Sequence, residues 1–270
     1  MSRFSLVQNA DGSVGFENQR TGNQVFQIDN NDNFVVIEKA SPASSFGAKQ
    51  TVADDFIEPT LSTSLWAVAS GSDGTAADPV FNAQAGGAVR GVTGAGAAGT
   101  MAANGTQISN ALTFQSDKGG MVFEARVKLS AITNISVFVG FTDQVGSLEA
   151  PITSAGSANT ITTNATDAVG FMFDTSMDDD NWWLVGVDNG TDATHQDSGT
   201  APTAATYQTF RIEVDTVGGA KFFIDGSQVG TAMVDAVKAD VLLSPVVAGF
   251  TRTAASANID ADYIFAQVDK

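Results

Sequence analysis

The chain has 270 residues, of which 43% are hydrophobic and 16% are charged, a composition that excludes an intrinsically disordered protein. Its 30 acidic and 13 basic residues give a net charge of −17, so Coulomb repulsion argues against nucleic acids and anionic membranes as partners. The absence of cysteine excludes disulfides, thiolate metal ligands and cysteine nucleophiles.

The first 40 residues are predicted to form a small β unit for anchoring or oligomerisation. Short apolar runs alternate there with turn sequences such as Asp11-Gly12 and Thr21-Gly22-Asn23. So short a segment makes a poor core by itself, and we expect it to use a partner surface. The apolar residues expected to serve assembly are Phe4, Leu6, Phe16, Phe26, Ile28 and Phe34.

Residues 41–53 are predicted to be a linker, because Ala, Ser, Pro and Gly dominate their first part. The N-terminus has neither the apolar core nor the cleavage site of a signal peptide. No apolar run is long enough to cross a bilayer. We therefore expect a protein made in the cytoplasm that has no membrane partner.

The main domain is predicted to span residues 54–270, and its first part has few clear signals. Residues 61–68, around Trp66, suggest a short helix after Pro59. Within a Gly/Ala tract at 83–105, residues 94–99 match the dinucleotide pattern G-x-G-x-x-G. A poor helix sequence follows and no alternation of strands and helices surrounds the pattern, so we expect no nucleotide site and no cofactor.

From residue 112 onward, the sequence favours antiparallel strands. Apolar and charged residues alternate in Met121–Leu129 and Tyr207–Thr216, as in strands with one face in a core and one in water. Asp225-Gly226 is a hairpin turn signal. Residues 144–166 are predicted to be a long loop. The fold class is therefore all-β, an antiparallel sandwich, with the remaining strands expected at Leu112–Gln115, Ile135–Thr142, Ala168–Asp174, Trp182–Asp188, Ala220–Ile224, Val246–Thr251 and Tyr263–Val268.

The most site-like cluster is Asp178-Asp179-Asp180-Asn181 followed by Trp182 and Trp183. The three carboxylates are candidate Ca²⁺ ligands, although the spacing of an EF-hand is missing. The two tryptophans are possible glycan contacts, because aromatic rings stack on sugars. The alternative, which we prefer, is a solvated turn with at least one tryptophan in the core. His195 is the only histidine and lies in a loop sequence, and no G-x-S-x-G elbow supports a catalytic triad.

The strand sequences 123–130, 137–143, 210–215, 221–226 and 262–265 resemble those of concanavalin A-like (laminin-G-like) jelly rolls. The resemblance covers residues 54–270 and implies a jelly-roll sandwich. In style the chain is similar to tailed-phage virion proteins that carry this domain, most of all capsid decoration (cement) proteins.

Glucanases of the same fold carry the strand pattern E-x-D-x-x-E. Here Glu213-Val214-Asp215 begins that pattern, but the final Glu is missing, which removes one of the two required carboxylates. We therefore expect no catalytic residues and no enzyme activity.

The resemblance implies a structural virion protein that decorates and stabilises a phage capsid surface. Its expected location is the virion, and its expected partners are the major capsid protein and further copies of itself, with a trimer as one expectation. The alternative is a carbohydrate-binding module of a fibre or adhesin, which would bind glycans.

Overall fold

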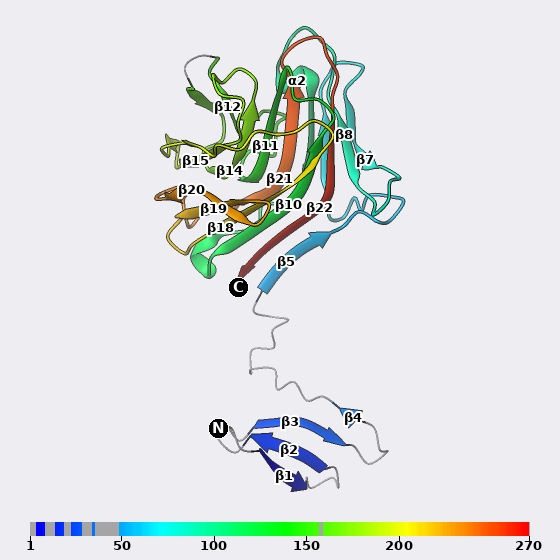
Figure 1. Cartoon of the computed structure of the whole chain (residues 1–270), viewed down its shortest axis with the longest axis vertical. Coiled ribbons are helices and arrows are strands. Elements are labelled where there is room, and N and C mark those ends of the chain that lie inside the picture. The colour runs from blue at the N-terminus through cyan, green and yellow to red at the C-terminus, as the bar shows by residue number, and fades with distance from the viewer. Residues whose placement is uncertain are drawn as a thin grey trace. The chain divides into compact units, whose positions relative to one another are not determined.

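The computed structural model describes residues 49–156 and 159–269, together with four short strands before them. The chain divides into two compact units, residues Met1–Lys49 and Gln50–Lys270 (Figure 1). Each unit is described by itself below.

The N-terminal unit is a four-stranded antiparallel sheet in the order β1-β2-β3-β4. In the register, Leu6 lies opposite Phe16, Phe16 opposite Phe26, and Ile28 opposite Phe34. The side chains of the six predicted assembly residues, Phe4, Leu6, Phe16, Phe26, Ile28 and Phe34, lie outside the described residues, so their role stays a prediction. The strands are β1 (Phe4–Gln8), β2 (Val14–Asn18), β3 (Asn23–Ile28) and β4 (Phe34–Val35).

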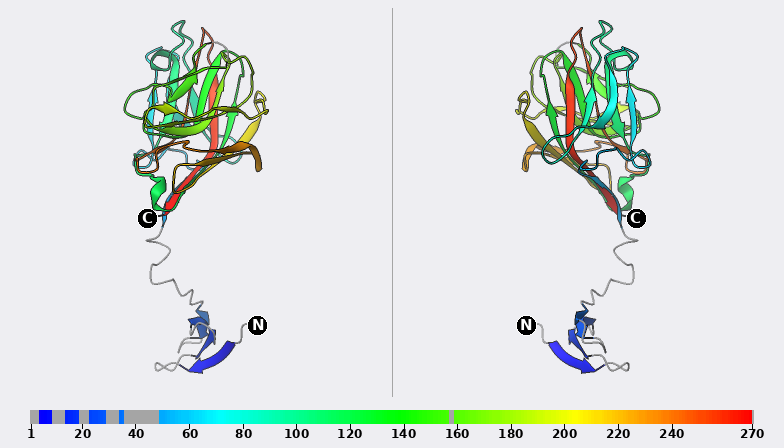
Figure 2. Two further views of the ribbon diagram at one scale, coloured as in Figure 1. Left: turned by 90° about the vertical axis from the view of Figure 1, so that its left-hand side faces the viewer. Right: turned by 90° about the vertical axis from the view of Figure 1, so that its right-hand side faces the viewer.

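The second unit is a sandwich of two eight-stranded sheets, which confirms the predicted fold class (Figure 2). Sheet I has the order β20-β19-β18-β10-β22-β8-β7, and β5 also pairs with β22. The C-terminus therefore lies beside the start of the sandwich (Figure 1). Its strands are β5 (Lys49–Asp54), β7 (Ala77–Phe81), β8 (Val89–Val92), β10 (Met121–Leu129), β18 (Tyr207–Val214), β19 (Ala220–Ile224), β20 (Ser227–Met233) and β22 (Asn258–Asp269).

Sheet II has the order β16-β15-β14-β11-β21-β9-β6, and β17 also pairs with β15. Its strands are β6 (Ala67–Ser70), β9 (Gly105–Ser109), β11 (Ile135–Thr142), β14 (Ala168–Asp174), β15 (Trp183–Asp188), β16 (Thr191–Asp192), β17 (Gln196–Asp197) and β21 (Ser244–Thr251). Outside the two sheets lie the hairpin of β12 (Ile152–Ser154) and β13 (Ile161–Thr163), the helix α2 (Met101–Asn104) and the 3-10 helix η1 (Ser116–Lys118).

The main core lies between the two sheets. Along β10 and β18, buried and partly exposed residues alternate without interruption, so the outer face of sheet I is in contact with water. By contrast, every residue of β11, β14 and β21 is buried. The central strands of sheet II are therefore covered on both faces.

A second apolar cluster covers the outer face of sheet II. Ile152 of the β12–β13 hairpin belongs to it, together with Phe138, Met172, Trp183 and Phe250 from four strands of the sheet. The prediction of a loop over residues 144–166 was therefore wrong for the hairpin. Its strands, Ile-Thr-Ser and Ile-Thr-Thr, have three residues each, which is too short to give a clear pattern.

Three further predictions need correction. Residues 61–68 form a turn followed by β6 instead of a helix, because Ala67–Ser70 pairs with β9. Residues Leu112–Gln115 form a single bridge between Phe114 and Leu243 instead of a strand. Residues 49–53 of the predicted linker belong to β5, because the edge of β22 offers them backbone partners. The Asp225-Gly226 turn is confirmed, with φ of 50° and 79° at its two residues.

Candidate functional site

The two tryptophans that were predicted as possible glycan contacts, Trp182 and Trp183, are buried. Trp182 is 1% exposed, packs 4.5 Å from Phe210 between ring centroids, and donates from Nε1 to Gln208. Trp183 is 6% exposed and lies in the second apolar cluster beside His195. This burial agrees with the interpretation as core residues. Glycan contact by Trp182 and Trp183 stays a prediction without geometric support.

The Asp178–Asp180 turn is held by hydrogen bonds of its own. Asn159 Oδ1 accepts the backbone N–H groups of Asp178 and Asp179, and Asn159 Nδ2 donates to the Asp179 carboxylate. Within the described ranges, no group of three or more His, Asp or Glu side chains could hold a metal ion. Of the candidate Ca²⁺ ligands Asp178, Asp179 and Asp180, the first two thus have partners that explain their conformation.

Glu213 lies on the outer face of sheet I, where it binds Arg211 at 2.7 Å and is 40% exposed. The single histidine accepts or donates through Nε2 at 2.7 Å from the backbone oxygen of Asn159. Both residues therefore have local structural partners.

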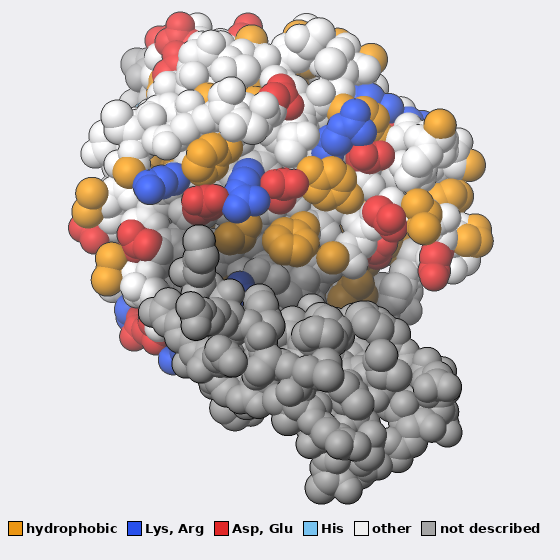
Figure 3. All heavy atoms as spheres, turned by 60° about the horizontal axis from the view of Figure 1, so that its bottom comes forward, with side chains coloured by type: hydrophobic (Ala, Val, Ile, Leu, Met, Phe, Trp, Pro, Cys, Tyr) orange, Lys and Arg blue, Asp and Glu red, His pale blue; other side chains and the backbone are white. Residues whose placement is uncertain are grey.

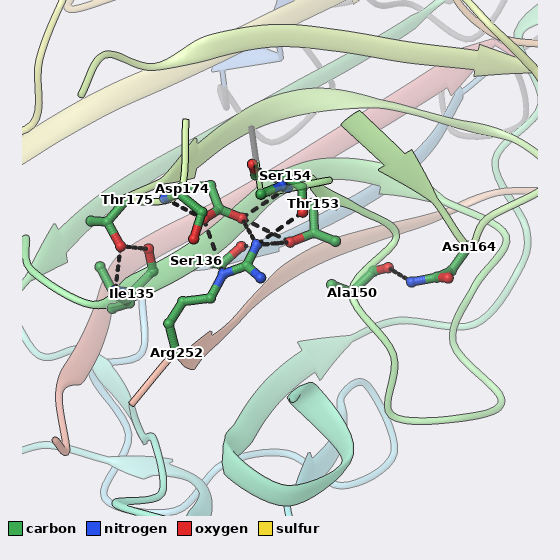
Figure 4. A network of polar contacts seen from close by, with 11 residues as sticks. Ile135, Ser136, Ala150, Thr153, Ser154, Asn164, Asp174, Thr175 and Arg252 are labelled. Carbon is green, nitrogen blue, oxygen red and sulfur yellow. Dashed lines mark hydrogen bonds and ion pairs between the residues drawn. The ribbon is translucent and has the colours of Figure 1, made fainter. Parts of the chain in front are cut away.

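The β12–β13 hairpin covers the outer face of sheet II and is held there by a polar network. Asp174 at the end of β14 is fully buried, and its carboxylate binds Arg252 at the end of β21 (Figure 4). The same carboxylate accepts from Thr153 Oγ1 at 2.8 Å and from the Ser154 backbone at 2.9 Å. Arg252 Nη2 also donates to Thr153 Oγ1 at 2.7 Å. This network joins β12 to two strand ends, so the hairpin is a fixed cover of this face.

The outer face of sheet I carries an ordered row of side chains. The register places Phe223 of β19 opposite Arg211 of β18, Arg211 opposite Glu124 of β10, and Glu124 opposite Phe265 of β22. All four residues are partly exposed. Figure 3 views the molecule from this side and shows charged side chains of both signs beside hydrophobic ones. The row places an ion pair between two aromatic rings.

A groove of about 440 Å³ opens at one end of this row. Tyr263 and Phe265, two residues apart on β22, line it together with Glu124 and with Asp54 and Asp55 at the end of β5. A second cavity of about 370 Å³ shares residues 53–55 with it and extends to Ile57 and Phe81. The two cavities therefore lie side by side along residues 53–58, at and just after the end of β5.

Hydrogen bonds fix the polar groups of the groove. Tyr263 donates its hydroxyl to Glu124 Oε1 at 2.7 Å, and Arg211 lies 3.4 Å from Glu124 Oε2. Burial and the hydrogen bond to Glu124 raise the pKa of Tyr263 to about 12, so the phenol is neutral at physiological pH. Asp54 accepts from the Phe56 backbone and from Trp66 Nε1, both at 2.8 Å. The adjacent Asp55 is exposed on the rim.

One other pair of acids lies at the ends of β11 and β14. Burial, with a smaller contribution from the Asp167 charge, raises the pKa of Asp143. Asp167 is 2% exposed, and its Oδ1 accepts from the backbone of Asn189 and Lys238. Neither acid lines the two cavities along residues 53–58.

Sequence reasoning missed the groove residues Glu124, Tyr263 and Phe265 as a site. Their outward orientation follows from the alternation along β10 and β22. Their neighbourhood does not, because residues 124 and 265 meet only through strand pairing.

Comparisons with known proteins identify the fold. The laminarinase catalytic domain of Thermotoga maritima MSB8 has a TM-score of 0.53 and 12% identity, over 83% of this chain and 99% of that one. The β-glucanase of Bacillus licheniformis has a TM-score of 0.52 and 13% identity, over 80% and 96%. The carbohydrate recognition domain of Emp47p has a TM-score of 0.52 and 10% identity, over 82% and 97%. No family model and no curated protein sequence matches the chain.

The second unit is thus a concanavalin A-like jelly roll, a fold that includes both enzymes and non-enzymes. At these identities the likeness concerns the fold, and function has to be argued from the site. Among the described helices, none has the length and apolarity needed to span a membrane.

Proposed function

We propose that this protein is a non-enzymatic carbohydrate-binding module of a virion fibre or adhesin, which the N-terminal unit attaches to a tailed-phage particle. The observation that carries the proposal is the groove on sheet I, which the rings of Tyr263 and Phe265 line together with the carboxylates of Glu124 and Asp55. Aromatic rings stack on the apolar face of a sugar, and carboxylates accept hydrogen bonds from its hydroxyl groups.

The electrostatics of the groove favour a neutral glycan. Three carboxylates line it, and the chain has a net charge of −17. An anionic sugar would lose hydration next to these negative charges. None of the residues that line the groove is a lysine or arginine that could offset the cost of this desolvation.

On the face of sheet II, β14 offers no accessible pair of carboxyl groups for glycoside hydrolysis. Glycoside hydrolysis requires two carboxyl groups about 5–10 Å apart around one bond of the substrate. The outward positions along β14 are Ala168, Gly170, Met172 and Asp174, and Asp174 is buried in its bond to Arg252. The β12–β13 hairpin covers this face as well.

A glycan array tests the proposal, probed in chelator and again with added Ca²⁺. We expect binding of the wild type to neutral oligosaccharides and a loss of at least tenfold in Phe265→Ala. The control is Val234→Ala, because Val234 is 78% exposed and does not line the groove. Absence of binding under both conditions, or equal binding by the two variants, would refute the groove as the site.

The same preparations can test for an enzyme. We expect no hydrolysis of β-glucans by the wild type. Hydrolysis that disappears in Glu213→Gln would show that Glu213 is catalytic and would overturn the non-enzymatic proposal.

The second candidate is a capsid decoration protein. It is favoured by the division into two compact units, the first of which has only 49 residues. Such a unit gains stability from a partner surface, for which the major capsid protein and other copies of this chain are candidates. The test is incubation of the full chain with undecorated capsids, and failure to bind them would count against decoration.

A further inference from the structure

Asn104, the last residue of α2, has a buried oxygen without a partner. Its side chain is 0% exposed, and Nδ2 donates to the backbone oxygens of Gly96 at 2.7 Å and Thr251 at 3.1 Å. These two bonds use both amide hydrogens and fix the orientation of the amide. Its Oδ1 atom has no hydrogen-bond partner among the described residues. A buried acceptor without a partner has lost its hydrogen bonds to water on folding, and a bound ligand would replace them.

The carboxylate of Asp73 lies next to this oxygen. A Cβ atom built on Gly96 would be 2.8 Å from both Asn104 Oδ1 and Asp73 Oδ2, so the two oxygens are no more than twice that distance apart. Asp73 Oδ1 accepts from the Thr75 backbone at 3.0 Å, from the Thr75 hydroxyl and from the Ala95 backbone at 3.2 Å. No ion pair between described residues includes Asp73.

We propose that Asp73 Oδ2 and Asn104 Oδ1 bind a Ca²⁺ ion. A cation placed near both of these acceptor oxygens, one of which is charged, would be attracted to both. Carboxylate and amide oxygens are ligands of Ca²⁺, and water completes its shell of six to eight oxygens. A single carboxylate gives low affinity, so we expect a Kd of the order of 10⁻⁴–10⁻³ M, as in modules that work at extracellular Ca²⁺ concentrations.

The proposed site would explain two glycines of the G-x-G-x-x-G pattern at residues 94–99, because both lie next to the ligand oxygens. A Cβ atom on Gly94 would lie 3.0 Å from Asn104 Oδ1, and one on Gly96 would lie 2.8 Å from each of the two ligand oxygens. A side chain at either position would therefore crowd the oxygens proposed as ligands. Bound Ca²⁺ would connect the loop after β6, the loop after β8 and, through Asn104, the backbone of Thr251 at the end of β21. It would thereby order one end of the sandwich.

The substitution Asp73→Asn tests the site without removing a side chain. The new amide keeps an oxygen for Thr75 and Ala95 and can donate its Nδ2 to Asn104 Oδ1. We therefore expect Asp73→Asn to fold and to match or exceed the thermal stability of the wild type in chelator. The control is Asp180→Asn, which removes one charge from the exposed Asp178–Asp180 turn.

The full-length proteins are titrated with Ca²⁺ by calorimetry and by thermal unfolding. We expect the wild type and Asp180→Asn to bind at the same affinity and to rise in Tm, and Asp73→Asn to bind at least tenfold more weakly. A wild type that neither binds Ca²⁺ nor rises in Tm would mean that a water molecule fills the site, which would overturn the proposal. Binding lost in Asp180→Asn and kept in Asp73→Asn would place the ion at the other turn and would also overturn it.

Discussion

Two buried carboxylates of the sandwich, Asp174 and Asp260, each form an ion pair with an arginine, and the two ion pairs connect different parts of the fold. Asp174 joins sheet II to its hairpin cover, and Asp260 fixes neighbouring strands of sheet I. Such a pair stabilises a fold little in comparison with apolar packing, but its disruption is costly because it leaves a buried charge without a partner.

We predict that Arg252→Met lowers the free energy of unfolding by about 3–5 kcal/mol, because Asp174 is 0% exposed and would keep an unpaired charge. The matched control is Arg126→Met, which breaks the more exposed pair with Asp262 and is expected to cost no more than about 1 kcal/mol. Urea unfolding of both variants measures the difference. Equal losses would mean that the Asp174 network does not secure the cover.

Asp260 gives a prediction about pH. Burial raises the pKa of this carboxyl, but hydrogen bonds from Arg90 and Lys128, at 2.6 and 3.0 Å, outweigh it and lower the pKa below its usual value. A lowered pKa adds stability above the unfolded value of about 3.9, and this stability is lost as the pH falls through the folded value. We expect Asp260→Asn to lose about 3 kcal/mol at pH 7.

Unfolding of both proteins between pH 7 and pH 2 checks this. The difference between them should be constant down to about pH 5 and should shrink below about pH 4. A difference that is independent of pH would mean that shape, and not charge, makes Asp260 important.

At the scale of elements, the β12–β13 hairpin decides which face of the sandwich is accessible. Its buried residue Ile152 packs into the second apolar cluster, whereas Ile161 on the other strand is partly exposed. The sequence between residues 144 and 166 is rich in Ser, Thr and Asn, so this cover depends on few apolar contacts.

We predict that Ile152→Ala destabilises the protein by about 2–5 kcal/mol, through lost burial and the cavity left behind. Ile161→Ala is the matched control and should cost less, because solvent already reaches that side chain. Thermal unfolding followed by tryptophan fluorescence measures both, and Trp183 in the same cluster should report a local change. A smaller loss in Ile152→Ala than in Ile161→Ala would contradict the role of the hairpin as a packed cover.

At the scale of the whole molecule, the two units divide at residues 49 and 50. We predict that deletion of residues 1–40 leaves a folded sandwich that no longer assembles, because β5 and all later strands remain. Circular dichroism should show an intact β spectrum, and light scattering should show a smaller particle than the full chain forms. An unfolded product would show that the first unit belongs to the main core, and an unchanged particle size would show that it anchors nothing.

The sequence by itself determined the all-β class and the central strands of the sandwich. Strands such as Met121–Leu129 and Ala220–Ile224 have the predicted bounds because alternation of apolar residues is a local property of a half-buried strand. The same holds for the turn at Asp225-Gly226, where backbone preference is local.

The tertiary structure decided the rest. Whether Trp182 is core or surface depends on Phe210, 28 positions later, and the groove requires Glu124 to meet Phe265 across two strands. The strands β5 to β9 form because other strands offer backbone partners to residues of weak local preference. Contacts between residues so far apart in sequence leave no periodic pattern, so the site could be seen only once the sheets were assembled.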